Sequence, residues 1–365
     1  MMTPMSAAPA RGGEDRPTSR SAGPSWWRRH PWLGAVAVFL VLGATALTVV
    51  LFSPVLDQEI EVRAEPASSY DAAMVLADDL RAADHDGVAP VCRTKVLDHG
   101  ERTARSVVLL HGFTNCPQQF SALADAYAEA GYSVVVPRLP GHGEADRLTT
   151  APSEVGPAQL AETGDRAVDV AAGLGEEVTV VGLSGGGTLA GWLASERDEV
   201  ATAVLMAPLV APKTLPEPAV APVARASRLI PDVYVWWDRD QKEELDDPPY
   251  AYPRFSVRSL GAFLALGRDT QRTDPGRDTP LERLVVVVNE NDAAVSNAGV
   301  YHVEGQLEQL LRLDVEGVDR VDHVFPAEAG FRHDIVDPAG ENAEHLDEIY
   351  PVLGGLLGLD GLTAP

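Results

Sequence analysis

The sequence has very little lysine, and its charge is strongly one-sided. Lysine occurs at only three of the 365 positions, Lys95, Lys213 and Lys242, while the formal net charge is −25 and the pI is about 4.6. A chain this acidic lacks the basic face that nucleic acid requires, so no nucleic-acid partner is expected. A solvated acidic surface that favours solubility is the simplest interpretation.

Patterns for metals and cofactors are also missing. The chain has no C-x-x-C, no H-E-x-x-H and no Walker or Rossmann glycine pattern, which argues against a zinc site and a bound nucleotide. His142, Glu144 and Asp146 are close in sequence, but their spacing matches no standard cation site and favours a polar turn. We therefore expect no metal and no cofactor.

Cysteine is nearly absent, and Cys92 and Cys116 are the only two. In an oxidising compartment they would form one disulfide, and two inert buried thiols are the alternative. Cys92 falls in a strand-like run at 91–97, and Cys116 follows the next strand-like run at 106–110. Because consecutive strands usually lie side by side, we expect a Cys92–Cys116 disulfide.

A long uncharged run from Trp32 to Phe52 marks the N-terminal part. It is long enough to span a bilayer and longer than a usual secretory h-region. We expect a transmembrane signal-anchor at 32–52, with a cleaved signal peptide and a secreted protein as the alternative. Arginines precede the run and acids follow it, so the positive-inside rule places a disordered tail, 1–31, in the cytoplasm. The main domain, after a stalk at 53–69, would lie outside the cell membrane.

Residues 70–365 alternate between apolar strand-like runs and amphipathic helix-like runs. This alternation predicts an α/β fold with a mostly parallel sheet and helices on both faces. Strands are predicted at 91–97, 106–110, 133–136, 177–181, 202–206, 281–289 and 320–325, and helices at 70–84, 117–130, 157–174, 188–196, 296–312 and 342–357.

The alternation breaks between the strands at 202–206 and 281–289. This segment is rich in proline and aromatic residues and carries an acidic run at 243–247. Structureless loops this long are uncommon in compact domains unless they cover a site. We expect 209–280 to form a cap over the site, with the acidic run in water. The alternative is a segment that only packs against the rest of the domain and does not contact the substrate. Some of its aromatic residues should line the site: Tyr234, Trp236, Trp237, Tyr250 and Tyr252.

The stretch Gly182-Leu183-Ser184-Gly185-Gly186 carries the clearest chemical signal. It follows an apolar strand and precedes a helix-like segment, which is the context of a nucleophile elbow rather than of a generic glycine-rich loop. In such an elbow a tight, strained turn lifts the serine hydroxyl clear of the sheet. Ser184 is therefore the candidate nucleophile.

A reactive serine needs a base and a group that orients the base. Asp292 follows the apolar strand at 281–289, with Glu290 as its competitor. His333 lies in a loop after the last predicted strand, from which it could reach back to the serine. His323, inside that strand, and His345, in the closing helix, are the weaker candidates for the base.

An oxyanion hole needs two convergent backbone N–H groups. Gly185, directly after the serine, should supply one, and Phe113, in the loop His111-Gly112-Phe113-Thr114, should supply the other. His111 could be mistaken for a base, but we expect it to pack beside the hole.

These motifs, together with Pro137-Arg138-Leu139-Pro140-Gly141-His142-Gly143, resemble the α/β-hydrolase family over about residues 90–360. Within it, the chain is similar to the carboxylesterase and monoacylglycerol lipase (lysophospholipase-like) branch. The resemblance implies a serine hydrolase that cleaves carboxylic esters of small molecules or lipids. Many relatives have methionine after the serine, so Gly185 would make the acyl site roomier or the elbow looser.

Two other functions stay open at this point. The same triad could serve an acyltransferase that acts on cell-envelope acceptors. A catalytically silent, membrane-anchored interaction protein could keep the fold without the chemistry. The motifs leave the acyl length, the physiological substrate and the oligomeric state open.

Overall fold

The structure is a computed structural model that describes residues 31–53, 60–246, 248–270, 280–296 and 317–365. The chain divides into two compact units, Met1–Val49 and Val50–Pro365. Helix α2 (Pro31–Phe52) accounts for the described part of the first unit. Its segment Trp32–Val49 is long and apolar enough to cross a membrane, and a signal sequence near an N-terminus has the same properties.

A seven-stranded sheet forms the centre of the second unit, in the order β1-β3-β2-β4-β5-β8-β9. Strand β1 (Lys95–Leu97) runs antiparallel to β3 (Ser133–Val136), and every other neighbouring pair is parallel. Parallel neighbours require crossover connections, which the helices supply. The other strands are β2 (Thr103–Leu110), β4 (Gly175–Leu183), β5 (Val200–Met206), β8 (Arg283–Asn289) and β9 (Asp319–Phe325).

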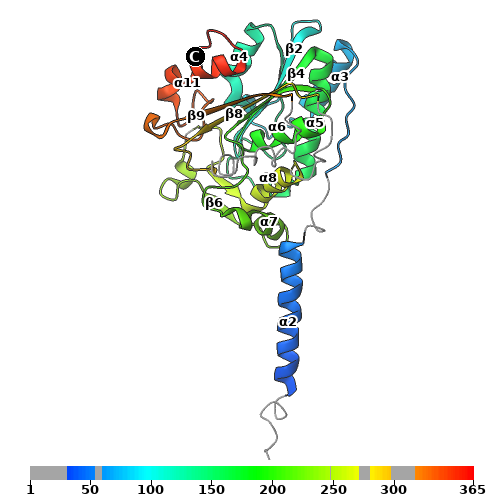
Figure 1. The fold of residues 1–365 in the computed structure, drawn as a ribbon, viewed down its shortest axis with the longest axis vertical. Coiled ribbons are helices and arrows are strands. Elements are labelled where there is room, and N and C mark those ends of the chain that lie inside the picture. The colour runs from blue at the N-terminus through cyan, green and yellow to red at the C-terminus, as the bar shows by residue number, and fades with distance from the viewer. Residues whose placement is uncertain (1–30, 54–59, 247, 271–279, 297–316) are drawn as a thin grey trace, which may run out of the picture. The chain divides into compact units, whose positions relative to one another are not determined.

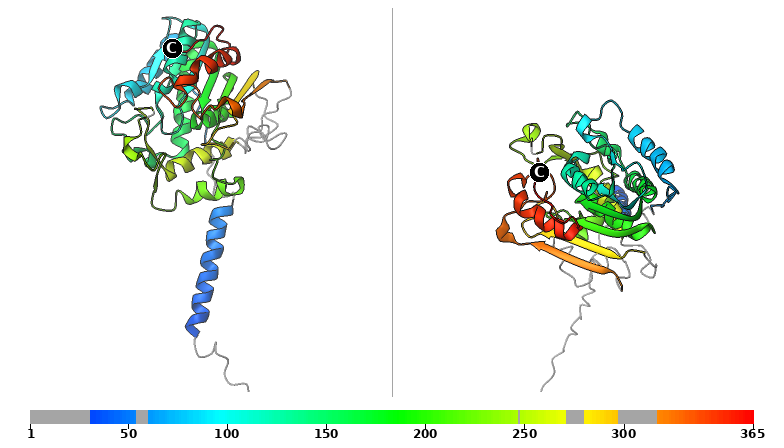
Figure 2. Two further views of the ribbon diagram at one scale, coloured as in Figure 1. Left: turned by 90° about the vertical axis from the view of Figure 1, so that its left-hand side faces the viewer. Right: turned by 90° about the horizontal axis from the view of Figure 1, so that it is seen from above.

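Helices cover both faces of this sheet (Figure 1). On one face lie α5 (Pro157–Leu174) and α6 (Gly185–Glu196), against which α3 (Tyr70–Ala82) and α8 (Val257–Thr270) pack. On the other face lie α4 (Ser121–Glu129) and α11 (Leu346–Leu357), as the second viewing direction agrees (Figure 2). The predicted α/β fold with a mostly parallel sheet is confirmed. The four consecutive valines of β8, Val285–Val288, are almost fully buried, as expected of a strand covered on both faces.

The first strand differs from its prediction. Residues Pro90–Cys92 form a 3-10 turn, and β1 begins only at Lys95. Because β3 lies between β1 and β2, the premise that consecutive strands neighbour each other is wrong here. The predicted helix at 296–312 falls, from residue 297 on, outside the described residues.

The segment between β5 and β8, which we call the cap segment, contains its own small sheet. After α7 (Glu217–Ala226), strands β6 (Tyr234–Trp236) and β7 (Arg254–Ser256) pair antiparallel, with a 3-10 turn (Lys242–Glu244) between them. The Arg254 guanidinium lies 4.4 Å from the Tyr234 ring centroid and 5.6 Å from that of Trp236. Cation–π contacts of this kind hold the two strands together through their side chains.

Residues directly before α3 are fastened to α5. The Arg197 side chain is fully buried and pairs with Asp165 and Asp169 of that helix at 3.3 and 2.6 Å. The same two carboxylates accept hydrogen bonds from Arg63 N and Glu65 N. The carboxylates therefore have partners on two sides, as buried charges require.

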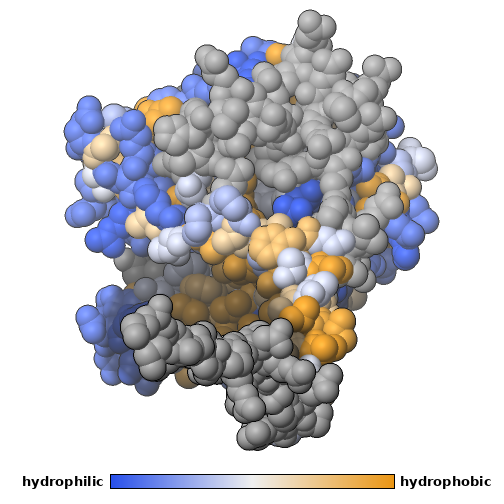
Figure 3. Space-filling view, turned by 60° about the horizontal axis from the view of Figure 1, so that its bottom comes forward, coloured by the Kyte–Doolittle hydropathy of each residue, from blue (hydrophilic) through white to orange (hydrophobic). Residues whose placement is uncertain are grey.

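Most other charged side chains are exposed to water. Figure 3 shows hydrophilic residues (blue) at both margins of the face it presents.

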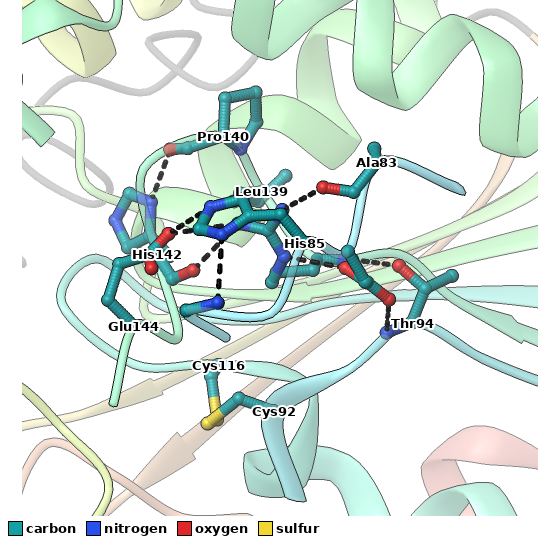
Figure 4. Close-up of polar contacts among 12 residues, drawn as sticks. Ala83, His85, Cys92, Thr94, Cys116, Leu139, Pro140, His142 and Glu144 are labelled. Atoms are coloured by element: carbon teal, nitrogen blue, oxygen red, sulfur yellow. Dashed lines mark hydrogen bonds and ion pairs between the residues drawn. A yellow bond between two sulfur atoms is a disulfide. The ribbon is translucent and has the colours of Figure 1, made fainter. Parts of the chain in front are cut away.

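A disulfide joins Cys92 to Cys116, and both residues are fully buried (Figure 4). It connects the turn before β1 to the start of a 3-10 turn, Pro117–Phe120. Gly143 packs directly on it, because a Cβ at this position would lie 2.7 Å from the Cys92 Cβ; its φ of +73° also suits glycine. The disulfide therefore leaves no room for a side chain at position 143.

Loss of the disulfide should destabilise the protein without abolishing its chemistry. The cysteines are 24 residues apart, and in the chain-entropy account a loop of this size contributes roughly 3 kcal/mol. We expect a Cys92→Ser/Cys116→Ser variant to lose about that much free energy of unfolding, measured by denaturant titration. Mass spectrometry of the alkylated, unreduced parent is the control: two alkylated thiols there would contradict the disulfide.

Candidate active site

Ser184 sits in a strained turn between β4 and α6. Its φ and ψ are 56° and −116°, a region that a non-glycine residue occupies only when its surroundings impose it. The turn is fixed by β5 and the chain after it, because Ser184 N donates to Met206 O and Ser184 O accepts from Leu209 N. This backbone has the geometry of a nucleophile elbow.

The elbow has no room for side chains on either side of the serine. A Cβ at Gly182 would lie 2.1 Å from the Gly186 carbonyl oxygen, and one at Gly186 would lie 1.9 Å from Leu110 O. Only glycine lets β2, β4 and α6 approach each other this closely. The glycines of the sequence motif are thus steric requirements of the turn.

Asp292 and His333 are brought together by the loops that follow β8 and β9. Asp292 Oδ2 lies 2.6 Å from His333 Nδ1, and Asp292 Oδ1 accepts from Ala294 N and Val295 N. Burial alone would raise the pKa of Asp292, but the His333 hydrogen bond and these amides bring it below its ordinary value. The carboxylate is therefore ionised, fully buried and aimed at one ring nitrogen.

His333 has the opposite electrostatic balance. Burial of the ring would lower its pKa, but the hydrogen bond and the charge of Asp292 raise it above its ordinary value. Since Nδ1 is bonded to Asp292, Nε2 is the nitrogen left to act on a substrate or on the serine hydroxyl.

Two asparagines that sequence reasoning missed hold the His333 loop. Asn289, the last residue of β8, donates to Phe331 O and to Arg332 O. Asn342 accepts from Arg332 N and donates to Arg332 O. A single asparagine carries no pattern of its own; for Asn289 the only signal is its place at the end of an apolar strand.

The competing residues are engaged elsewhere. Glu290 is exposed and accepts from Ala327 N. His323 packs on Phe325, and His345 packs on Phe331. Within the ranges that the structure describes, no group of three or more His, Cys, Asp or Glu residues could hold a metal ion.

His111 lies beside the site but is not placed to act as a base. It is fully buried, its Nδ1 lies 3.0 Å from Gly112 O, and its Nε2 accepts from Leu139 N. Burial and the neighbouring His142 hold its pKa well below the ordinary value. A neutral ring with both nitrogens engaged fits the packing role that the sequence predicts.

The two candidate oxyanion amides lie close together. A Cβ at Gly185 would lie 3.2 Å from the nitrogen of Phe113. As the first residue of α6, Gly185 has no acceptor within its helix. The Phe113 N–H has no hydrogen-bond acceptor among the described residues. Two free amides beside a serine can stabilise a developing negative charge.

The space beside Gly185 is already filled. A side chain at this position would meet the ring of Phe263 of α8, whose Cε1 lies 2.8 Å from the Cβ position. Phe263 is fully buried and packs edge-on against Phe113, with the ring centroids 5.3 Å apart. The expectation that Gly185 makes the acyl site roomier is therefore wrong, because an aromatic ring from the cap segment takes the space.

Ser184 and His333 line one cavity of about 810 Å³ together with the cap segment. Of the five aromatic residues singled out in the sequence, Trp237 and Tyr252 line this cavity. Trp237 donates from Nε1 to Thr114 Oγ1, and the Tyr252 hydroxyl donates to Gly141 O. The remaining three face other parts of the protein: Tyr234 and Trp236 stack on Arg254, and Tyr250 donates to Asp337.

Comparisons with known proteins agree with this arrangement. The sequence profile of the alpha/beta hydrolase family matches residues 107–334, more than half of the chain. A thermostable monoacylglycerol lipase from Bacillus sp. (strain H-257) is 35% identical over 112 residues, which cover 28% of this chain and 40% of that protein. The chain thus matches less than half the length of this relative.

Solved structures share the fold at low sequence identity. A monoacylglycerol lipase from Paleococcus ferrophilus aligns with a TM-score of 0.51 at 19% identity, over 73% of this chain and 98% of that one. A soluble variant of monoglyceride lipase from Saccharomyces cerevisiae aligns with a TM-score of 0.53 at 15% identity, over 73% and 91%. With the profile match, these findings establish that the chain belongs to the alpha/beta hydrolase family.

Proposed function

We propose that this protein is a serine hydrolase that cleaves carboxylic esters with an apolar acyl chain. The observation that carries the proposal is the 2.6 Å contact between Asp292 and His333 at a cavity that Ser184 also lines. Sequence similarity to a monoacylglycerol lipase supports an ester of lipid type as substrate. The largely apolar wall that Phe113, Phe331 and the cap segment contribute fits an acyl chain.

In the proposed mechanism Ser184 attacks the acyl carbonyl. His333 Nε2 takes the serine proton and returns it to the leaving alcohol, while Asp292 keeps the imidazole in the required tautomer. The amides of Phe113 and Gly185 hold the oxyanion of the tetrahedral intermediate. Water then enters, His333 removes its proton, and the acyl-enzyme is hydrolysed by the same path in reverse.

We further propose that α2 anchors the catalytic unit outside the cell membrane. The apolar segment Trp32–Val49 has the length of a span, and arginines before it favour a cytoplasmic N-terminus. A buried disulfide in the catalytic unit supports an oxidising compartment. Protease protection of the catalytic unit in spheroplasts, or release of a shortened soluble chain, would contradict the anchored orientation.

Replacement of the triad residues should abolish turnover while the fold survives. We expect Ser184→Ala and His333→Ala each to lower kcat for a p-nitrophenyl ester by several orders of magnitude. His323→Ala is the matched control and should keep most of the parental activity. Asp292→Asn should lose activity because the imidazole tautomer is no longer fixed. Near-parental turnover in His333→Ala would show that another residue is the general base.

The pH profile should show an acid limb set by His333. The base acts only when neutral, and Asp292 raises its pKa in the folded protein. Activity should therefore fall as the pH drops through a midpoint above about 6.5, the ordinary value for histidine. The residual activity of Asp292→Asn should show this midpoint at a lower pH, because the carboxylate that raises the pKa of His333 is gone. An acid limb centred clearly below that ordinary value in the parent would contradict the assignment.

The cap segment offers a matched pair of tryptophans for a test of acyl selectivity. Trp237 lines the cavity, whereas its neighbour Trp236 lies against Arg254. We expect Trp237→Ala to change the preference among p-nitrophenyl esters of increasing chain length, with a small change in melting temperature. Trp236→Ala should keep the parental preference. Identical chain-length profiles for parent and Trp237→Ala would leave the cap segment a structural role only.

A further inference from the structure

One buried side chain spans the gap between the two loops that carry the candidate chemistry. Gln119 lies in the 3-10 turn Pro117–Phe120 and is 3% exposed. Its Oε1 accepts from Gly112 N at 2.6 Å, and its Nε2 donates to Asp334 Oδ2 at 2.7 Å. Gly112 directly precedes Phe113, and Asp334 directly follows His333. One amide group therefore touches both loops at once.

The orientation of this amide is fixed by chemistry. A backbone N–H can only donate, so the group that faces Gly112 must be the amide oxygen. The amide nitrogen then faces Asp334 Oδ2, which accepts its hydrogen bond. The carboxamide supplies one acceptor and one donor, as the two partners require. Glutamate, leucine or alanine would leave at least one contact unmade or repulsive.

The far end of the link is itself held rigidly. Asp334 is 7% exposed, and its Oδ1 accepts from Val336 N and Asp337 N. Asn342 donates to Asp334 O at 2.6 Å. With both of its oxygens occupied, Asp334 is a fixed anchor for Gln119. Through Gln119, the backbone at Gly112 is therefore held at a fixed distance from the His333 loop.

We propose that Gln119 is a positioning residue that sets the distance between the oxyanion amide of Phe113 and the imidazole of His333. The inference rests on the proposed function of the site. Gln119 does not touch the serine, and it acts through Gly112 and Asp334. An error of about 1 Å in such a placement can cost on the order of 100-fold in rate.

The first test replaces the amide by a side chain of similar size. Gln119→Leu should lower kcat for a p-nitrophenyl ester between about 10- and 100-fold. KM should change less than about threefold, because Gln119 lines the cavity with only 3% of its surface exposed and leucine is of similar size. Gln118→Leu is the matched control. Gln118 lies in the same turn but bonds to Lys95 Nζ and Ser121 Oγ, and its variant should keep the parental kcat.

The second test exchanges the two partners. In Gln119→Glu two carboxylates face each other, and in Asp334→Asn two amide nitrogens do, so each single variant should lose kcat. In the double variant one carboxylate oxygen at position 119 still accepts from Gly112 N. The amide at position 334 then donates to the other carboxylate oxygen, while its own oxygen keeps the two backbone N–H groups. We expect the double variant to recover at least about tenfold over the worse single variant.

The outcomes separate this inference from the proposed function. Fluorophosphonate labelling of the parent, and its loss in Ser184→Ala, tests the serine hydrolase itself. If the parent is active but Gln119→Leu keeps the parental kcat, the positioning role is wrong. If the exchanged pair is no better than the single variants at equal melting temperature, it is wrong as well. Should Gln119→Leu not fold, the exchanged pair alone decides.

Discussion

The crowding of the backbone at Ser184 is the constraint on which the rest of the structure depends. The turn exists only because Gly182 and Gly186 let β2, β4 and α6 come within contact of one another. That closeness brings the Phe113 amide beside Gly185, and it leaves a gap that the Phe263 ring fills from the cap segment. Asp292 and His333 reach the same place because the loops after β8 and β9 lie at the same edge of the sheet as the end of β4.

Much of the fold could be predicted from sequence because it follows from local periodicity. The bounds of β3 and α5 agree with the expected ranges, and the glycine pattern places Ser184 between a strand and a helix. What could not be predicted depends on contacts between distant segments. Gln119 and Asp334 are 215 residues apart, and no local pattern distinguishes Trp237, which lines the cavity, from its neighbour Trp236.

The acidity of the chain has a second use inside the protein. Some buried carboxyl groups are stabilised here by backbone N–H groups of their own loop, as Asp292 is by Ala294 N and Val295 N. Asp334 has the same arrangement with two amides of its own loop. Such local turns hold each carboxyl group in place and stabilise the loop around it. Rigid loops at the sheet edge are what a preorganised site requires.

The fastening of Arg63 and Glu65 to α5 also decides where the chain leading into α3 is attached. The amide contacts to Asp165 and Asp169, which Arg197 holds in place, tie this segment to one helix. Helix α5 packs against β2, β3 and β4. Strands β8 and β9, whose loops hold Asp292 and His333, stand at the other end of the sheet order. The point of attachment and the imidazole are thus separated by the width of the sheet.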